Sequence, residues 1–201
     1  MRRVSIDTLN SSPDEVFRFR ELLGNGGVAA VPTETFYALA ADPTNATGVK
    51  RIFEVKGRDD RKPLPVLFGL RSQLDRLGVS VQPNVLDHYF QIWPAPLTVV
   101  FPIREPIAAS RGQSALAVRL PAAAKLRLFL SSSGALTGTS VNRSGSPPID
   151  RPDTVEALFR RDIDVLVDGG VTPGGKTSTI VDATVDPPVV LRAGAFPWPG
   201  R

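Results

Sequence analysis

Positively charged side chains gather in one short segment, residues 56–62. Four cations occupy its seven positions, among them Lys56, Arg58 and Lys62. The planar guanidinium of arginine and the ammonium of lysine both suit a di- or triphosphate, and both stabilise the charge that develops on a leaving pyrophosphate. The alternative is a solvated basic loop that Asp59 and Asp60 partly neutralise, and the segment alone leaves both interpretations open.

Small hydroxyl and amide side chains follow two apolar segments elsewhere in the chain. Thr33 and Thr35 come soon after the apolar residues 28–31, and the alternate residues Ser140 and Asn142 would face one side of a strand. Ligands bind at the carboxyl ends of strands in open α/β sheets, so both positions suit a site. Each also has a structural interpretation: Thr33 could cap a following helix, and the second segment could be an ordinary Ser/Thr-rich turn.

The numbers of cysteine and histidine residues exclude several kinds of chemistry. The chain has no cysteine and a single histidine, His88. It therefore has no disulfide, no thiolate nucleophile and no metal site built from several histidines. A Ser-His-Asp triad would need His88, and no Gly-x-Ser-x-Gly segment accompanies it. Catalysis would have to use lysine, arginine, hydroxyl, amide and carboxylate groups with a bound metal, for which no protein ligand is assigned.

Residues 170–177 match the phosphate-binding pattern G-x-x-x-x-G-K-[ST] letter for letter. That pattern binds phosphate only when a helix begins at its lysine, because the helix N-terminal amides surround the anion. Here β-branched residues follow Lys176, and Pro187 and Pro188 come soon after them. We therefore predict a glycine-rich turn between two strands.

The elements that would position these groups alternate between strand and helix. Apolar runs predict strands at 28–31, 64–68, 97–101, 116–120, 136–141, 165–167, 179–181 and 189–191. Capping residues and apolar spacing predict helices after Ser12, between Asn45 and Gly57, near 74–77 and 85–90, and over 122–130 and 155–160. This alternation predicts an α/β domain with a large twisted sheet.

Composition and charge set the class of protein. The chain is 42% hydrophobic and carries a net charge of +4, which favours a polyanionic partner such as a nucleotide or RNA, although a mildly basic surface explains the charge equally well. No apolar stretch follows Arg2 and Arg3, and no apolar run approaches the roughly 20 residues that span a bilayer. We expect one cytoplasmic domain over 1–201 that makes no membrane contact and has an irregular tail over about 195–201.

Together, the polar segments described above and several further short motifs resemble one family, the YrdC-like L-threonylcarbamoyladenylate synthases. The resemblance rests on seven short motifs in the family's order: Pro32-Thr33-Glu34-Thr35-Phe36-Tyr37, Lys56-Gly57-Arg58 with Lys62, Trp93-Pro94-Ala95-Pro96-Leu97-Thr98, Ala117-Val118-Arg119, Ser140-Val141-Asn142, Ser178-Thr179-Ile180 and Arg192-Ala193-Gly194. Each motif is weak alone, and the ordered set is specific.

The resemblance implies an α/β fold with an open twisted mixed sheet, flanking helices and a concave basic active-site face. It implies a nucleotidyltransferase that joins L-threonine, bicarbonate and ATP, with Mg²⁺ bridging phosphates, into threonylcarbamoyl-AMP and pyrophosphate. This is the first step of a tRNA modification, so tRNA and a downstream threonylcarbamoyl transferase are possible partners. By position, the threonine-binding residues are Thr35, Arg119 and Ser178; the catalytic residues are Lys56, Arg58 and Lys62; and the nucleotide-binding residues are Arg58, Lys62, Ser140, Asn142 and Arg192.

Several positions depart from the family pattern, among them Ala122-Ala123-Ala124, where the family often has Asp-His-Pro or similar. Ala38 and Ala95 replace glycines, and Leu67 stands where many members carry a histidine near the threonine. Because Ala38 also occurs in a paralogous branch, a non-catalytic nucleotide- or RNA-binding paralogue of the same fold is the alternative function. The chain nevertheless keeps the Lys-x-Arg and Ser-x-Asn residues that this branch tends to lose.

Overall fold

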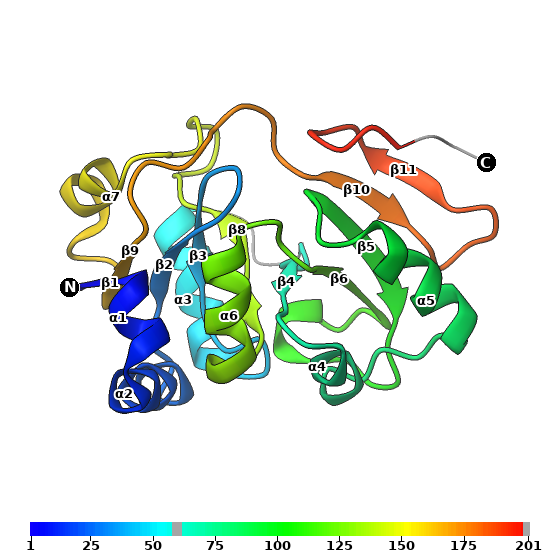
Figure 1. The fold of residues 1–201 in the computed structure, drawn as a ribbon, viewed down its shortest axis with the longest axis horizontal. Helices are drawn as coiled ribbons and strands as arrows, with labels where there is room; N and C mark the ends of the chain where they lie inside the picture. Colours follow the sequence, from blue (N-terminus) through cyan, green and yellow to red (C-terminus); the bar gives the residue numbers. More distant parts are fainter. Residues whose placement is uncertain (58–61, 199–201) are drawn as a thin grey trace.

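The computed structural model describes residues 1–57 and 62–198 and contains two mixed sheets flanked by helices (Figure 1). The first sheet has five strands in the spatial order β1 (Arg2–Ser5), β9 (Val165–Asp168), β2 (Ala29–Pro32), β3 (Tyr37–Ala40) and β8 (Thr139–Ser140). The second has six, in the order β11 (Val189–Arg192), β10 (Thr179–Asp182), β5 (Leu97–Pro102), β6 (Ala115–Arg119), β4 (Val66–Leu67) and β7 (Leu136–Thr137). The predicted α/β class with open mixed pairing is confirmed, and the strands form two sheets where we expected one.

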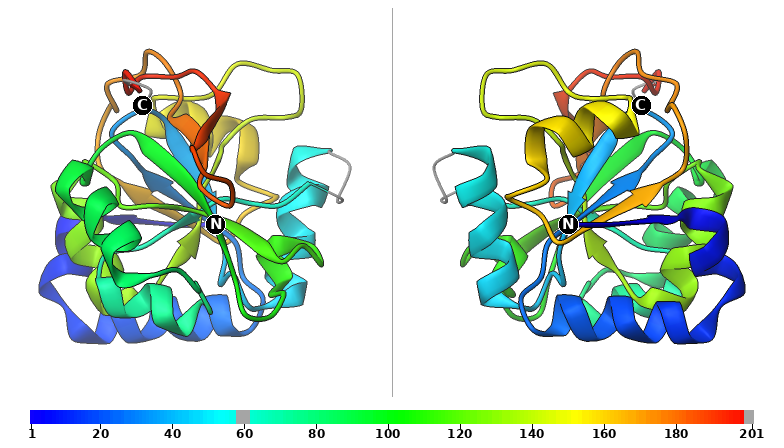
Figure 2. Two further views of the ribbon diagram at one scale, coloured as in Figure 1. Left: turned by 90° about the vertical axis from the view of Figure 1, so that its right-hand side faces the viewer. Right: turned by 90° about the vertical axis from the view of Figure 1, so that its left-hand side faces the viewer.

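Helices cover both sides of the strands. They are α1 (Ile6–Ser11), α2 (Pro13–Gly24), α3 (Ala46–Lys56), α4 (Arg71–Arg76), α5 (Pro83–Ile92), α6 (Ala124–Ser133) and α7 (Pro152–Phe159), with a short 3₁₀ helix η1 (Ala108–Ser110). Figure 2 shows α3 on one side of the strands and α1 and α6 on the other. No helix within the described ranges is long and apolar enough to cross a membrane.

Strand alternation explains how both sides of the first sheet are buried. On β2, Ala29 and Val31 pack in the cluster that contains residues of α1, α2 and α6, while Ala30 packs in the cluster that contains residues of α3. Successive strand residues point to opposite faces, so a strand covered on both faces must be apolar throughout. This is why 28–31 is an unbroken apolar run.

Gly57 fixes the end of α3, the helix that carries Lys56. Asn45 begins α3 by accepting a hydrogen bond from the Gly48 amide at 3.0 Å. Gly57 ends it in the left-handed conformation, with φ of 58°, which glycine adopts without a steric cost. Lys56 is therefore the last residue of the helix, as the sequence predicted, and its position is set by the backbone.

The predicted strand 136–141 is two short strands that belong to different sheets. β7 pairs with β4 in the second sheet and β8 pairs with β3 in the first, so the chain crosses between the sheets at Gly138. A Cβ atom at Gly138 would lie 2.5 Å from Cγ of Leu67. Glycine is required here because the backbone passes directly against a buried leucine.

Other departures lie near the amino terminus and in the β2–β3 turn. Residues 2–11 form β1 and α1, which the short charged sequence did not indicate. Residues 37–40 form β3, antiparallel to β2, so Thr33 lies in a hairpin turn and does not cap a helix. Residues 170–177 match the sequence pattern of a phosphate-binding loop, but, as predicted, no helix begins at Lys176. They belong to an irregular connection from β9 to β10, which arches over the other strands in Figure 1.

Candidate functional site

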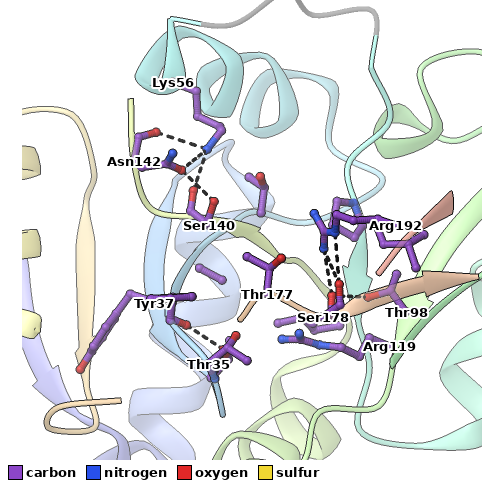
Figure 3. A pocket seen from close by; sticks show the side chains of 18 of the residues that line it. Thr35, Tyr37, Lys56, Thr98, Arg119, Ser140, Asn142, Thr177, Ser178 and Arg192 are labelled. Atoms are coloured by element: carbon purple, nitrogen blue, oxygen red, sulfur yellow. Dashed lines mark hydrogen bonds between the residues drawn. The ribbon is translucent and has the colours of Figure 1, made fainter. Parts of the chain in front are cut away.

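A cavity of about 350 Å³ opens between the two sheets, and its lining comes from both. The lining includes the hairpin turn before β3, the end of α3, β8, the ends of β6 and β11, and the residues that lead into β10. Figure 3 shows two groups of polar side chains, one around Lys56 and one around Arg119 and Ser178. Most of the residues that the sequence singled out therefore meet in one place.

Lys56 organises the first group, which we call the lysine end of the cavity: Lys56, Ser140 and Asn142. The residue is 4% exposed, and its Nζ donates to the Ser140 main-chain oxygen at 2.7 Å, to Oδ1 of Asn142 at 2.8 Å and to the Asn142 main-chain oxygen at 3.2 Å. Ser140 Oγ also donates to Oδ1 of Asn142, at 2.7 Å. The ammonium thus holds the backbone of residues 140–142 and brings a positive charge to the cavity wall.

Arg119 is the most unusual residue of the second group, the arginine end: Thr35, Thr98, Arg119, Ser178 and Arg192. It is the last residue of β6, its side chain is only 7% exposed, and its guanidinium makes no hydrogen bond with any described residue. The nearest carboxylate is Glu34, with 3.6 Å between Nη1 and Oε1. Burial lowers the pKa of Arg119, while the charge of Glu34 acts to raise it.

Ser178 links three elements at the arginine end. Arg192, at the end of β11, donates to the Ser178 main-chain oxygen at 2.7 and 3.2 Å and to its Oγ at 3.3 Å. Oγ of Ser178 also lies 2.9 Å from Oγ1 of Thr98 on β5. Burial, and then the positive charge of Arg119, lowers the pKa of Arg192. Two guanidinium groups therefore share this end of the cavity, which would attract an anion.

The turn before β3 supplies hydroxyl groups. Thr33 Oγ1 donates to the Phe36 main-chain oxygen at 2.7 Å and accepts from the Thr35 amide at 3.1 Å, which closes the turn. The Thr35 side chain lines the cavity, and Figure 3 shows Arg119 reaching toward it. Tyr37 points elsewhere: its hydroxyl donates to the Gly170 main-chain oxygen at 2.8 Å.

The structure does not place every predicted residue. Arg58 lies outside the described residues. Lys62 is exposed, and its side chain is not part of the cavity lining. Ala38 and Leu67 do line the cavity, whereas His88 lies on α5, away from it.

Two contributors were not singled out as site residues from the sequence. Thr98 appeared only within a motif, and its signal is a polar residue inside the apolar run 97–101. Glu34 stands between two threonines of the turn, and its pairing with Arg119 depends on how the two sheets meet.

In the part of the chain that the structure describes, no set of side chains is arranged to bind a metal ion. No group of three or more histidine and carboxylate side chains gathers there in a metal-binding arrangement, and the described lining of the cavity has no carboxylate. Cations, hydroxyls and amides instead suit phosphate and carboxylate groups.

Comparison with known proteins gives consistent matches. The Sua5_yciO_yrdC family model, described as telomere recombination, matches residues 21–194. Threonylcarbamoyl-AMP synthase of Pyrococcus abyssi is 37% identical over 175 residues, which cover 86% of this chain and 52% of that protein. The synthase of Methylobacillus flagellatus is 37% identical over 166 residues, 81% of this chain and 92% of that one.

A solved structure also matches. The crystal structure of P. abyssi Sua5 complexed with L-threonine has a TM-score of 0.82 and 33% identity, over 91% of this chain and 55% of that one. The chain thus spans about half the length of the P. abyssi protein.

Proposed function

The chain belongs to the Sua5/YciO/YrdC family, and from this premise we propose that it synthesises L-threonylcarbamoyl-AMP from L-threonine, bicarbonate and ATP, with release of pyrophosphate. The relatives named above are threonylcarbamoyl-AMP synthases. The proposed activity is that of a nucleotidyltransferase, because an AMP group passes from ATP to a carbamate.

The observation that carries the proposal is the unsatisfied guanidinium of Arg119. A buried cation without hydrogen bonds is costly, so its presence in a cavity wall favours an anionic ligand that supplies the missing acceptors. A carboxylate fits best, because its two oxygens match the planar N–H donors of arginine. The hydroxyls of Thr35 and Ser178 lie at the same end of the cavity and would complete a small polar site for L-threonine.

The lysine end would take the nucleotide. The Lys56 ammonium lies at the cavity wall, and Ser140 and Asn142 add hydroxyl and amide groups that can bond to phosphate and ribose oxygens. We assign Arg58 and Lys62 to the phosphates with them. Arg192 lies between the two ligands in this assignment, because it contacts Ser178 while its charge would also serve the α-phosphate.

The chemistry then consists of positioning and charge stabilisation. The threonine nitrogen attacks the carbon of bicarbonate, with loss of water, or of CO₂, with loss of a proton from nitrogen, and gives a carbamate. A carbamate oxygen then attacks the α-phosphorus of ATP, and the bond from that phosphorus to the leaving pyrophosphate breaks. Fixed cations favour this step because negative charge builds up on the leaving group. Mg²⁺ enters with ATP as the counter-ion of its phosphates. The product would serve a transferase that modifies tRNA.

Pyrophosphate release tests the proposal. Purified protein with Mg²⁺, ATP and bicarbonate should release pyrophosphate in the presence of L-threonine and much less with L-serine, and mass spectrometry should detect threonylcarbamoyl-AMP. No threonine-dependent release would overturn the proposal. Salt-sensitive RNA binding that survives Lys56→Ala, without turnover, would instead support the non-catalytic alternative.

A further inference from the structure

Glu34 has a buried carboxylate that the structure leaves unsatisfied. Its side chain is 12% exposed, and both Oε atoms are buried without a hydrogen-bond partner in the described residues. Its one close charged neighbour among them is Arg119, whose Nε is also buried and unpartnered. Two opposite charges thus face each other at 3.6 Å without a formed hydrogen bond.

Other arginines of the same protein show what a purely structural ion pair looks like. Arg3 donates to Asp153, Glu156 and Asp168 over 2.7–2.9 Å. Arg51 donates to both oxygens of Asp164, at 2.7 and 3.3 Å. Their guanidinium groups are bonded directly to carboxylates, whereas the N–H groups of Arg119 remain available.

The position of Glu34 shows how it would act. Arg119 belongs to the cavity lining and Glu34 does not, although its neighbours Thr33 and Thr35 do. The cavity lining therefore includes the threonines on either side of Glu34 but not its carboxylate. Glu34 would therefore influence a ligand through Arg119.

We infer that Glu34 is a positioning residue: its carboxylate anchors the Arg119 guanidinium from outside the cavity, so that the free N–H groups face the substrate's carboxylate. The inference rests on the proposed function, since it takes an amino acid as the ligand of Arg119. The loose 3.6 Å contact provides the counter-charge that burial requires without using the donors that the ligand needs.

Substitution of Glu34 tests the inference, because two physical effects of Glu34→Gln have opposite signs. If the carboxylate only repelled the substrate's carboxylate, its removal would tighten threonine binding. If it positions Arg119, its removal leaves a buried guanidinium without an anchor and weakens binding. We expect the Kd and KM for L-threonine to rise at least about tenfold, as for loss of a partner to a buried charged group, with the Kd for ATP within about twofold of wild type.

Matched variants separate this effect from a general loss of structure. Asp164→Asn removes the carboxylate beside Arg51, away from the cavity, and should lower the melting temperature without changing the threonine Kd. Glu34→Asp keeps the charge on a shorter side chain and should recover part of the threonine affinity. If Glu34→Gln does not fold, Glu34→Asp decides the matter: weaker threonine binding with unchanged ATP binding supports the inference, and unchanged threonine binding overturns it.

The outcomes also separate this inference from the proposed function. Unchanged or tighter threonine binding by Glu34→Gln, together with loss of binding in Arg119→Gln, would overturn the role of Glu34 and leave the synthase proposal intact. No threonine binding by the wild-type protein would overturn both. Isothermal titration of L-threonine with ATP and Mg²⁺ present measures threonine binding by each protein, and a separate titration of ATP with Mg²⁺ measures the Kd for ATP.

Discussion

The ammonium of Lys56 lies 2.7 Å from the main-chain oxygen of Ser140, so the end of α3 is joined directly to β8 (Figure 3). The same nitrogen also bonds to Asn142 at two atoms. A residue predicted to be catalytic therefore also holds the backbone beside which the phosphate would lie. Its substitution should affect both stability and activity.

Lys56→Met should lower the free energy of unfolding by roughly 1–3 kcal/mol, because buried acceptors on residues 140 and 142 lose their donor. The turnover rate should fall much further than stability alone explains, because the charge at the lysine end is lost. Urea unfolding and pyrophosphate release measure the two effects. Ser140→Ala, which keeps the main-chain acceptor, is the control and should leave stability nearly unchanged.

Arg119→Lys should raise the KM for L-threonine by about 100-fold, because a single ammonium cannot form the paired hydrogen bonds of a guanidinium with a carboxylate. The KM for ATP should stay close to the wild-type value. Steady-state kinetics with each substrate varied in turn measures both. An equal rise in both KM values would contradict the assignment of the arginine end to the amino acid.

Gly138→Ala should destabilise the protein by about 1–3 kcal/mol, the usual cost of overpacking a filled core. The new Cβ would lie within 2.5–2.9 Å of three side-chain atoms of Leu67, which is almost fully buried. Gly24→Ala is the matched control, because a Cβ there meets nothing within 4 Å. Thermal unfolding should show a lower melting temperature for the first variant only, and Leu67→Ala in the same chain should restore part of the difference.

Lys176→Ala should leave the ATP affinity within about twofold of wild type, because the segment that resembles a phosphate-binding loop has no helix after it to bind phosphate. Titration of ATP into both proteins tests this. A tenfold loss of affinity would show that the connection from β9 to β10 binds the nucleotide after all.

Acid should weaken the contact between β1 and β9 through Asp168. Burial raises the pKa of this carboxyl, but the Gly170 amide and Arg3 outweigh burial and leave the pKa lowered in the folded protein. A lowered folded-state pKa stabilises the protein above the unfolded-state value, about 3.9, and that contribution is lost as the pH falls through the folded-state pKa. Urea unfolding between pH 3 and pH 6 should show a smaller loss of stability on acidification for Asp168→Asn than for the wild type.

The sequence predicted most of the elements and the main candidates, because both depend on local signals. Asn45 and Gly57 mark the ends of α3, and the strand of Arg119 is a clear apolar run. The pairing of Glu34 with Arg119 could not be predicted, because it depends on how two sheets meet. The division of residues 136–141 between those sheets was missed for the same reason, since nothing in the run tells which strand each half joins.

The first sheet places β9, from late in the chain, between β1 and β2, from its beginning. During synthesis on the ribosome, the amino-terminal strands therefore have no central partner until residues 165–168 have emerged. The arginine end comes later still, because Ser178 directly precedes β10 and Arg192 is the last residue of β11. Pairing between such distant segments is slow to form, since a long loop must close first. A nascent chain that stops before residue 165 would expose the edges of β1 and β2 and would carry no complete site.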